Sequence, residues 1–180
     1  MVSYKRLLIS ILILPFSAVA IIPAILLFLD DQSRMIWLLK SPWWIIGLIF
    51  SGLLIISGLA LLVQTNHLFF RIGQGTLATW DPPQSLVTAG PYRYVRNPMI
   101  LGVFFLMLGE AILFWSGAIF IWLLVFLLLN LIYIPFVEES VMQNRFGKEF
   151  DVFKENVPAW IPRLNPWQSE IEKSPINHSN

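Results

Sequence analysis

The chain of 180 residues contains no cysteine, only two histidines, and few charged residues, which make up 13% of it. The absence of cysteine excludes disulfides, zinc–thiolate and iron–sulfur sites, and a cysteine nucleophile. With His67 and His178 as the only imidazoles, a multi-histidine metal site is not expected either. A net charge of +1 offers no positively charged surface for nucleic acid. We therefore expect neither a metal ion nor a nucleic acid as a partner.

Hydrophobic residues are abundant: they make up 57% of the chain, against about 45–50% in soluble domains. Charged residues are missing from four stretches, at positions 7–29, 41–70, 97–109 and 111–137. The first stretch would rise about 34 Å as a helix, enough to cross a hydrocarbon core of about 30 Å. We predict an all-α, multi-pass transmembrane protein with about four spans. These are 7–29, 43–64 and a hairpin of a third and a fourth helix that turns near residues 115–117.

The N-terminus also admits another interpretation, a cleaved signal peptide. Lys5 and Arg6 precede the apolar run, and residues 17–20 form a small-residue pattern like a cleavage site. The apolar run continues for nine residues past Ala20, which favours a retained helix.

The basic residues are distributed unevenly between the two sides that four spans would define. Ten of the twelve fall on the side of the termini, and Arg34 and Lys40 fall on the other. Because cytoplasmic segments carry the excess of Lys and Arg, both termini should be cytoplasmic. The polar segments long enough to build a site then face the cytoplasm.

The segment 71–97 interleaves glycine and proline with aromatic residues and predicts an ordered loop rather than a flexible linker. It ends in Asn97-Pro98, where Asn is a preferred N-cap and Pro suits the first helical position. A helix starting at Pro98 places free backbone donors beside Arg93 and Arg96, which is a possible anion site. The alternative is that these arginines only anchor the helix end at the headgroups.

After the fourth helix, Glu138 and Glu139 open a tail that contains apolar residues at helical spacing, namely Phe146, Phe150, Phe153 and Val157. We expect an amphipathic helix, slightly weakened by Gly147 and ended before Pro158, lying in the interface or over the ends of the hairpin. One interpretation of the two glutamates is simply a solvated helix end. A hairpin, however, brings them to the segment 96–98, where a zwitterionic small molecule could bind between the opposite charges.

These motifs resemble a known superfamily. The segment 90–102, the Glu138-Glu139 pair, the segment 146–150 and the segment 157–163 are together similar to the isoprenylcysteine carboxyl methyltransferase and phospholipid methyltransferase superfamily, in particular to its bacterial members. These are integral membrane enzymes that use S-adenosylmethionine. The resemblance implies a cofactor site that includes Tyr92, Arg96, Asn97, Pro98, Gly102, Glu138 and Glu139. Asn97 stands where the superfamily usually has His, and Ile100 where it has Tyr.

The resemblance further implies methyl transfer to a membrane-associated or small acceptor, which is a carboxylate, thiol, amine or alcohol, without a metal. Glu139 and Arg96 are then the candidate catalytic residues. The bacterial inner (plasma) membrane is the expected location, with the lipid bilayer as a partner. Two alternatives remain: a non-catalytic membrane protein that retains the fold, and a sterol-reductase-like enzyme that uses NADPH.

The sequence divides into three parts on this interpretation. Residues 1–70 carry the first two helices, 71–163 form a methyltransferase-like core, and 164–180 form a polar tail that we expect to be flexible. Glu110, about 18 Å along the third helix, lies in the outer half of the bilayer. An ionisable residue at that depth is a functional candidate, but its closeness to the hairpin turn favours a structural role.

Overall fold

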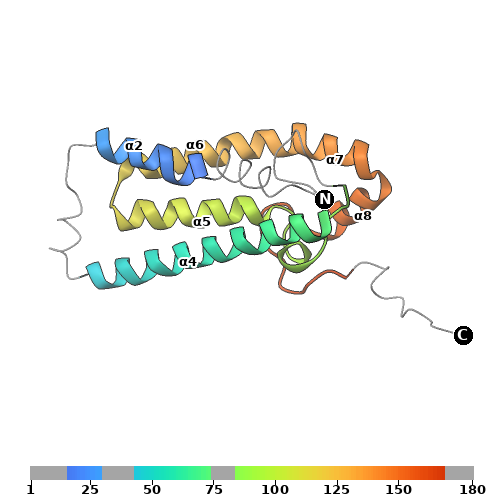
Figure 1. Cartoon of the computed structure of the whole chain (residues 1–180), viewed down its shortest axis with the longest axis horizontal. Helices are drawn as coiled ribbons and strands as arrows, with labels where there is room; N and C mark the ends of the chain where they lie inside the picture. The colour runs from blue at the N-terminus through green and yellow to red at the C-terminus, as the bar shows by residue number, and fades with distance from the viewer. Residues whose placement is uncertain (1–15, 30–42, 74–83, 169–180) are drawn as a thin grey trace, which may run out of the picture.

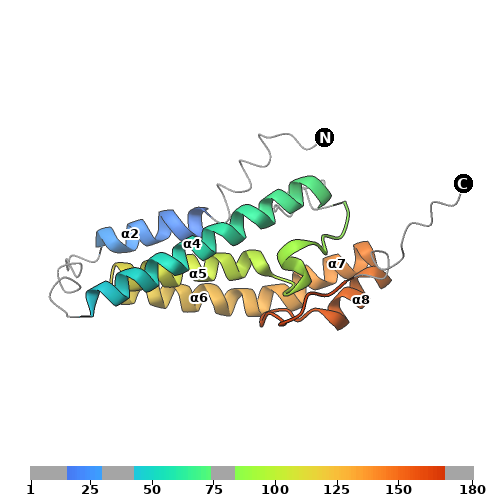
Figure 2. The same ribbon diagram turned by 90° about the horizontal axis from the view of Figure 1, so that it is seen from below.

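The computed structural model describes residues 16–29, 43–73 and 84–168, and these residues form helices and connecting segments without a strand. The fold is therefore all-α, as predicted. Its long helices lie side by side along one direction, and the short helices α7 and α8 are at one end (Figure 1). Figure 2 shows the same bundle from below, with that end again at the right.

The described part of the first predicted helix is helical throughout. A π-helical turn, η1 (Ser17–Ile21), leads into α2 (Ile22–Leu29). Pro23 has no backbone N–H, and the wider π turn before it lets the helix continue past the missing donor. Residues 7–15 of the predicted helix lie outside the described residues.

The second helix, α4 (Trp44–Leu68), is longer than the predicted 43–64 and continues through a π-helical turn, η2 (Phe69–Gly73). Its polar end stays helical because the side chains bond within the helix. Thr65 Oγ1 donates to Leu61 O at 2.7 Å, and Asn66 Nδ2 donates to Leu62 O at 2.7 Å. Residues 71–73, which the prediction assigned to the loop, are therefore helical, and residues 74–83 of the predicted loop lie outside the described residues.

Helix α4 packs closely on α5 (Pro98–Leu113) through glycines. A Cβ atom at Gly58 would lie 2.6 Å from Gly102 O, and one at Gly109 would lie 3.0 Å from Ser51 O. Any side chain at these positions would push the two backbones apart. Small residues at such crossings let helices approach closely in membrane proteins.

Helices α5 and α6 (Gly117–Tyr133) are connected by residues 114–116. Ser116 caps α6, since its Oγ accepts a hydrogen bond from Ile119 N at 3.3 Å. Between the helices lies a buried cluster of Val103, Met107 and Leu123. The first helical segment joins this group where Trp122 Nε1 donates to Ala18 O at 3.0 Å.

Helix α6 does not end before the glutamates. It continues through η4 (Ile134–Glu138) into α7 (Glu139–Phe146), and the helical run from 117 to 146 has 30 residues. The prediction that Glu138 and Glu139 open a tail was therefore wrong. Pro135 removes one backbone donor, and the π turn at η4 accommodates the loss without ending the helix.

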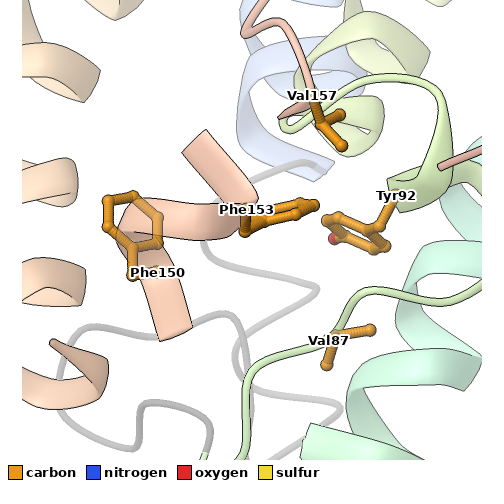
Figure 3. Packing of buried hydrophobic residues seen from close by; sticks show 5 residues of the cluster. All are labelled: Val87, Tyr92, Phe150, Phe153 and Val157. Atoms are coloured by element: carbon orange, nitrogen blue, oxygen red, sulfur yellow. The ribbon is translucent and has the colours of Figure 1, made fainter. Parts of the chain in front are cut away.

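Gly147 ends this run, where the sequence analysis expected it only to weaken a helix. Its φ of +51° is a conformation that other residues rarely adopt, and α8 (Lys148–Asn156) starts directly after it in a new direction. Phe150 and Phe153 of α8 belong to one buried cluster with Val157, Val87 and Tyr92, and Figure 3 shows the Phe153 ring directed toward the Tyr92 ring. Val157 is extended and ends α8 before Pro158, as predicted.

Two helical runs, 44–73 and 117–146, are long and apolar enough to cross a membrane by length and composition. Many of their large side chains are exposed, among them Ile49, Phe50, Ile56, Ile121, Leu128 and Leu129. Exposed apolar side chains in this number are unfavourable in water and favourable in lipid.

Candidate functional site

The segment that precedes α5 forms one wall of the site. Residues 84–97 carry a short 3-10 turn, η3 (Gly90–Arg93), in which Gly90 has a φ of +59° and lies against Leu68 of α4. Val87, Tyr92 and Val95 are buried. The described part of the predicted loop is thus held in place by its own apolar residues.

A second segment, residues 158–167, runs beside the first and is called the strap below. Figure 2 shows it turning back from α8 toward the start of α5. Backbone hydrogen bonds of 2.9 Å join the two segments, from Arg96 N to Pro158 O, from Arg163 N to Tyr94 O and from Trp167 N to Arg93 O. Arg93 Nε also donates to Trp167 O at 2.8 Å, and the Trp167 ring contacts Phe153. These bonds reach Trp167, beyond residue 163 where the predicted core ends, and residues 169–180 of the predicted tail lie outside the described residues.

Asn97 precedes α5, and the helix starts at Pro98 as predicted. The Asn97 side chain does not cap the helix, however. Its Nδ2 donates to Ala159 O of the strap at 3.1 Å. The amide thus ties the start of α5 to the strap.

Arg96 and Glu139 meet, as the sequence analysis expected. Arg96 Nη1 lies 2.6 Å from Glu139 Oε1, and both side chains are largely buried, with exposed fractions of 12% and 13%. The other carboxylate oxygen, Oε2, lies 2.6 Å from Lys154 Nζ of α8. Glu139 therefore joins the start of α5, the α6–α7 run and α8.

A pocket opens beside this ion pair. Its polar lining consists of Tyr92, Arg96, Asn97, Glu138 and Glu139, and its apolar lining of Phe69, Leu86, Val87, Ile134, Met142, Phe146, Phe150 and Phe153. Five of the seven predicted site residues thus lie around one pocket. Pro98 and Gly102 do not line it: Pro98 is buried at the start of α5, and Gly102 packs against Gly58.

The polar groups of the pocket are in different electrostatic surroundings. Burial, and secondly the charge of Glu138, raise the pKa of Tyr92 well above its usual range, so its phenol stays protonated. Arg96 Nε is buried and has no hydrogen-bond partner among the described residues. Within the same residues, Glu138 has no ion-pair partner, whereas Glu139 has two. Among the described residues, the pocket lining thus includes a guanidinium with one unbonded N–H group, on Arg96, and a carboxyl group without an ion-pair partner, on Glu138.

The sequence did not indicate Lys154 as part of the site, and it placed residues 157–163 in the core only through the family resemblance, without their contact with residues 93–97. Lys154 is one of several charged residues on α8, and nothing in its spacing distinguishes it from its neighbours. The strap is joined mainly by backbone groups, which leave no trace in side-chain identity. The apolar lining of Phe146, Phe150 and Phe153, by contrast, follows the helical spacing found in the sequence.

The long apolar helices and the pocket with both charge signs at one end of the bundle are typical of a helical membrane protein that binds a small molecule. A family model for phospholipid methyltransferases matches residues 45–149, more than half of the chain, and the chain belongs to this family. Membership implies a membrane methyltransferase. The matched range contains the loop, the pocket glutamates and Arg96. No curated protein and no solved structure matches the chain.

Proposed function

We propose that the protein is an integral membrane methyltransferase that transfers a methyl group from S-adenosylmethionine to a membrane-associated or small acceptor, which is a carboxylate, thiol, amine or alcohol. The observation that carries the proposal is the ion-paired pocket of Arg96 and Glu139, whose lining residues, except Phe150 and Phe153, lie in the range that the family match covers.

The residues present fit such a donor molecule, which carries a carboxylate, an amino group, ribose hydroxyls, an adenine ring and a sulfonium. Arg96 would donate to the carboxylate, since its buried Nε has no partner among the described residues, and the N-terminus of α5 adds positive potential beside it. Glu138 is an acceptor for an amino or hydroxyl group. The phenylalanines of the lining suit a flat ring. When bound, S-adenosylmethionine supplies the methyl group as an electrophile.

The chain's own contribution is then to hold two reactants in line and exclude water. Reacting atoms held about 3–3.5 Å apart can gain about 7–11 kcal/mol from positioning alone. We propose that Arg96 binds the anionic part of the donor and that Glu139 fixes the guanidinium of Arg96. An acceptor that carries a proton also needs a base. Glu138 is placed for this role, because no cation neutralises it among the described residues.

The arrangement in the membrane belongs to the same proposal. We place four spans in the bilayer, with the α5–α6 pair as the third and fourth. Both termini lie on the cytoplasmic side of a bacterial plasma membrane. Residues 1–70 form the first two spans and 71–163, extended by the rest of the strap, form the methyltransferase core.

Binding of S-adenosylmethionine to the detergent-purified protein tests the proposal. The wild type should bind it, and Arg96→Ala and Glu139→Ala should each weaken binding at temperatures where they remain folded. Arg145→Ala and Glu155→Ala change exposed residues of the same kinds and are the matched controls. A wild type that does not bind S-adenosylmethionine contradicts the proposed function.

Transfer of a labelled methyl group to a membrane extract would then define the acceptor. A methyl ester releases methanol in alkali, whereas N-methyl, S-methyl and O-alkyl products keep the label. Glu138→Gln keeps an oxygen that can accept a hydrogen bond from the donor, so it should slow the formation of an alkali-stable product more than it weakens donor binding.

A further inference from the structure

The strap exposes large apolar side chains although its backbone is held in place. Ile161 is 79% exposed and Leu164 is 96% exposed, the largest exposed fraction among the described large hydrophobic residues. The hydrogen bonds at Pro158, Arg163 and Trp167 fix the chain on both sides of them. These side chains therefore cannot turn inward without breaking the contacts with residues 93–96.

The position of the strap along the bundle indicates what surrounds it. Helix α5 has 16 residues and is about 24 Å long, so Pro98 lies near one boundary of a hydrocarbon core of about 30 Å when Leu113 lies near the other. Along the neighbouring helical run, Glu138 lies about 32 Å from Gly117, at a similar depth. Because the strap is bonded directly to Arg96 and Asn97, it lies at this boundary too.

The composition of the strap is that of a membrane interface. It combines Ile161 and Leu164 with Trp160, Trp167 and Arg163, and tryptophan is enriched where acyl chains meet headgroups. Arg163 Nη1 donates to Asn156 O at 2.7 Å, which holds its charge toward the end of α8. A stable protein–protein interface buries about 800 Å² of surface on each partner, and two exposed side chains provide far less than that.

We propose that the strap is a lipid-contacting element, with Ile161 and Leu164 inserted at the boundary between headgroups and acyl chains of the membrane that holds the helices. The strap then links the bilayer to the pocket, because the residues to which it is bonded, Arg96 and Asn97, line the pocket. This placement stands on exposure and depth and does not depend on any methyl transfer.

The natural absence of cysteine allows a direct test. Ile161→Cys and Leu164→Cys are each made in the full chain, labelled with a thiol-reactive bimane and reconstituted in phosphatidylcholine vesicles with and without lipid that carries a doxyl group near the headgroup. Leu129→Cys, on the exposed apolar face of α6, is the control for lipid contact, and Glu155→Cys, on the exposed face of α8, is the control for water contact.

The expected result is a loss of bimane fluorescence at 161 and 164 with doxyl lipid that clearly exceeds the loss at 155, together with weaker quenching by aqueous iodide. Quenching at 161 and 164 that equals that at 155 for both quenchers would overturn the proposal. So would protection from both quenchers, because the strap would then be covered by protein. Unfolding of each labelled variant is monitored in parallel. A variant less stable than Glu155→Cys is replaced by a chain in which Asn165→Cys carries the label and Ile161 or Leu164 is changed to serine.

Discussion

Glu139 accepts a cation on each of its two carboxylate oxygens, and the two cations differ in their surroundings. Arg96 is largely buried, whereas half of the Lys154 side chain is exposed. A buried charge that loses its partner is left uncompensated in an environment of low polarity. The bond to Arg96 should therefore matter more to stability than the bond to Lys154.

Glu139→Ala should accordingly lower the free energy of unfolding by about 3 kcal/mol or more, since it leaves Arg96 buried without a counter-charge. Lys154→Ala should cost less than about 1 kcal/mol, the usual range for exposed pairs. Unfolding followed in detergent measures both. Equal losses from the two variants would show that the exposed bond carries as much as the buried one.

Tyr92 should make stability depend on pH in the alkaline range. Its pKa is raised in the folded protein, first by burial and then by Glu138, so the folded chain keeps a proton that the unfolded chain releases near pH 10. The stability contributed by this group is complete below pH 10 and declines above it, by up to about 1.4 kcal/mol per pH unit.

Tyr92→Phe should remove that part of the decline. Thermal unfolding between pH 8 and 11 compares it with the wild type, and Tyr94→Phe, a change at an exposed phenol, is the control. An unchanged alkaline slope in Tyr92→Phe would contradict the prediction.

At the scale of the elements, two glycines separate backbone conformation from packing. A Cβ atom at Gly147 or at Gly52 would meet nothing within 4 Å, but only Gly147 has a positive φ. Gly147→Ala should therefore cost about 1–3 kcal/mol through backbone strain. Gly52→Ala, in the middle of α4, should cost nothing or stabilise the helix by about 0.5–1 kcal/mol.

Thermal unfolding of both variants in the same detergent gives the comparison. If both alanine variants shift the midpoint equally, the break between α7 and α8 does not depend on the conformation of Gly147. Because α8 contributes Phe150 and Phe153 to the pocket lining, Gly147→Ala is also expected to displace these two side chains.

The elements also show how local signals can mislead. Pro135 and Gly147 are both helix breakers by propensity, yet the helix passes through Pro135 and stops at Gly147. A π turn can accommodate the donor that a proline lacks, whereas a helix cannot continue through a residue with a positive φ. The sequence alone does not show which of the two breakers is compensated.

At the scale of the whole molecule, the proposed topology predicts opposite accessibility for two positions. Gly117→Cys, at the start of α6, should react with a membrane-impermeant maleimide on intact cells. Glu155→Cys, on α8, should react only after the membrane is opened. Reaction of both from the same side would exclude a crossing by the helical run between them, and the reverse pattern would invert the orientation.

The all-α fold, the start of α5 and the meeting of Arg96 with Glu139 were predictable, because each follows from hydropathy, a Pro at the first helical position and two charged motifs. The strap, the Asn97 contact with Ala159 and the Lys154 bond were not. The strap pairs through backbone atoms, Asn97 bonds to a backbone carbonyl, and Lys154 is one of several charged residues on α8, so side-chain identity does not single out these contacts.

The Arg96–Glu139 bond connects two helices of unequal length. Arg96 precedes the 16 residues of α5, while Glu139 lies within a helical run of 30 residues. A helix longer than the hydrocarbon core is thick can tilt to keep its apolar length in the lipid. A shorter helix has no excess length and does not need to tilt. If the longer run tilts, Glu139 moves along the start of α5, and we therefore expect the Arg96–Glu139 bond to depend on membrane thickness. The lipid in which the protein resides would thus help to set whether the pocket is properly assembled.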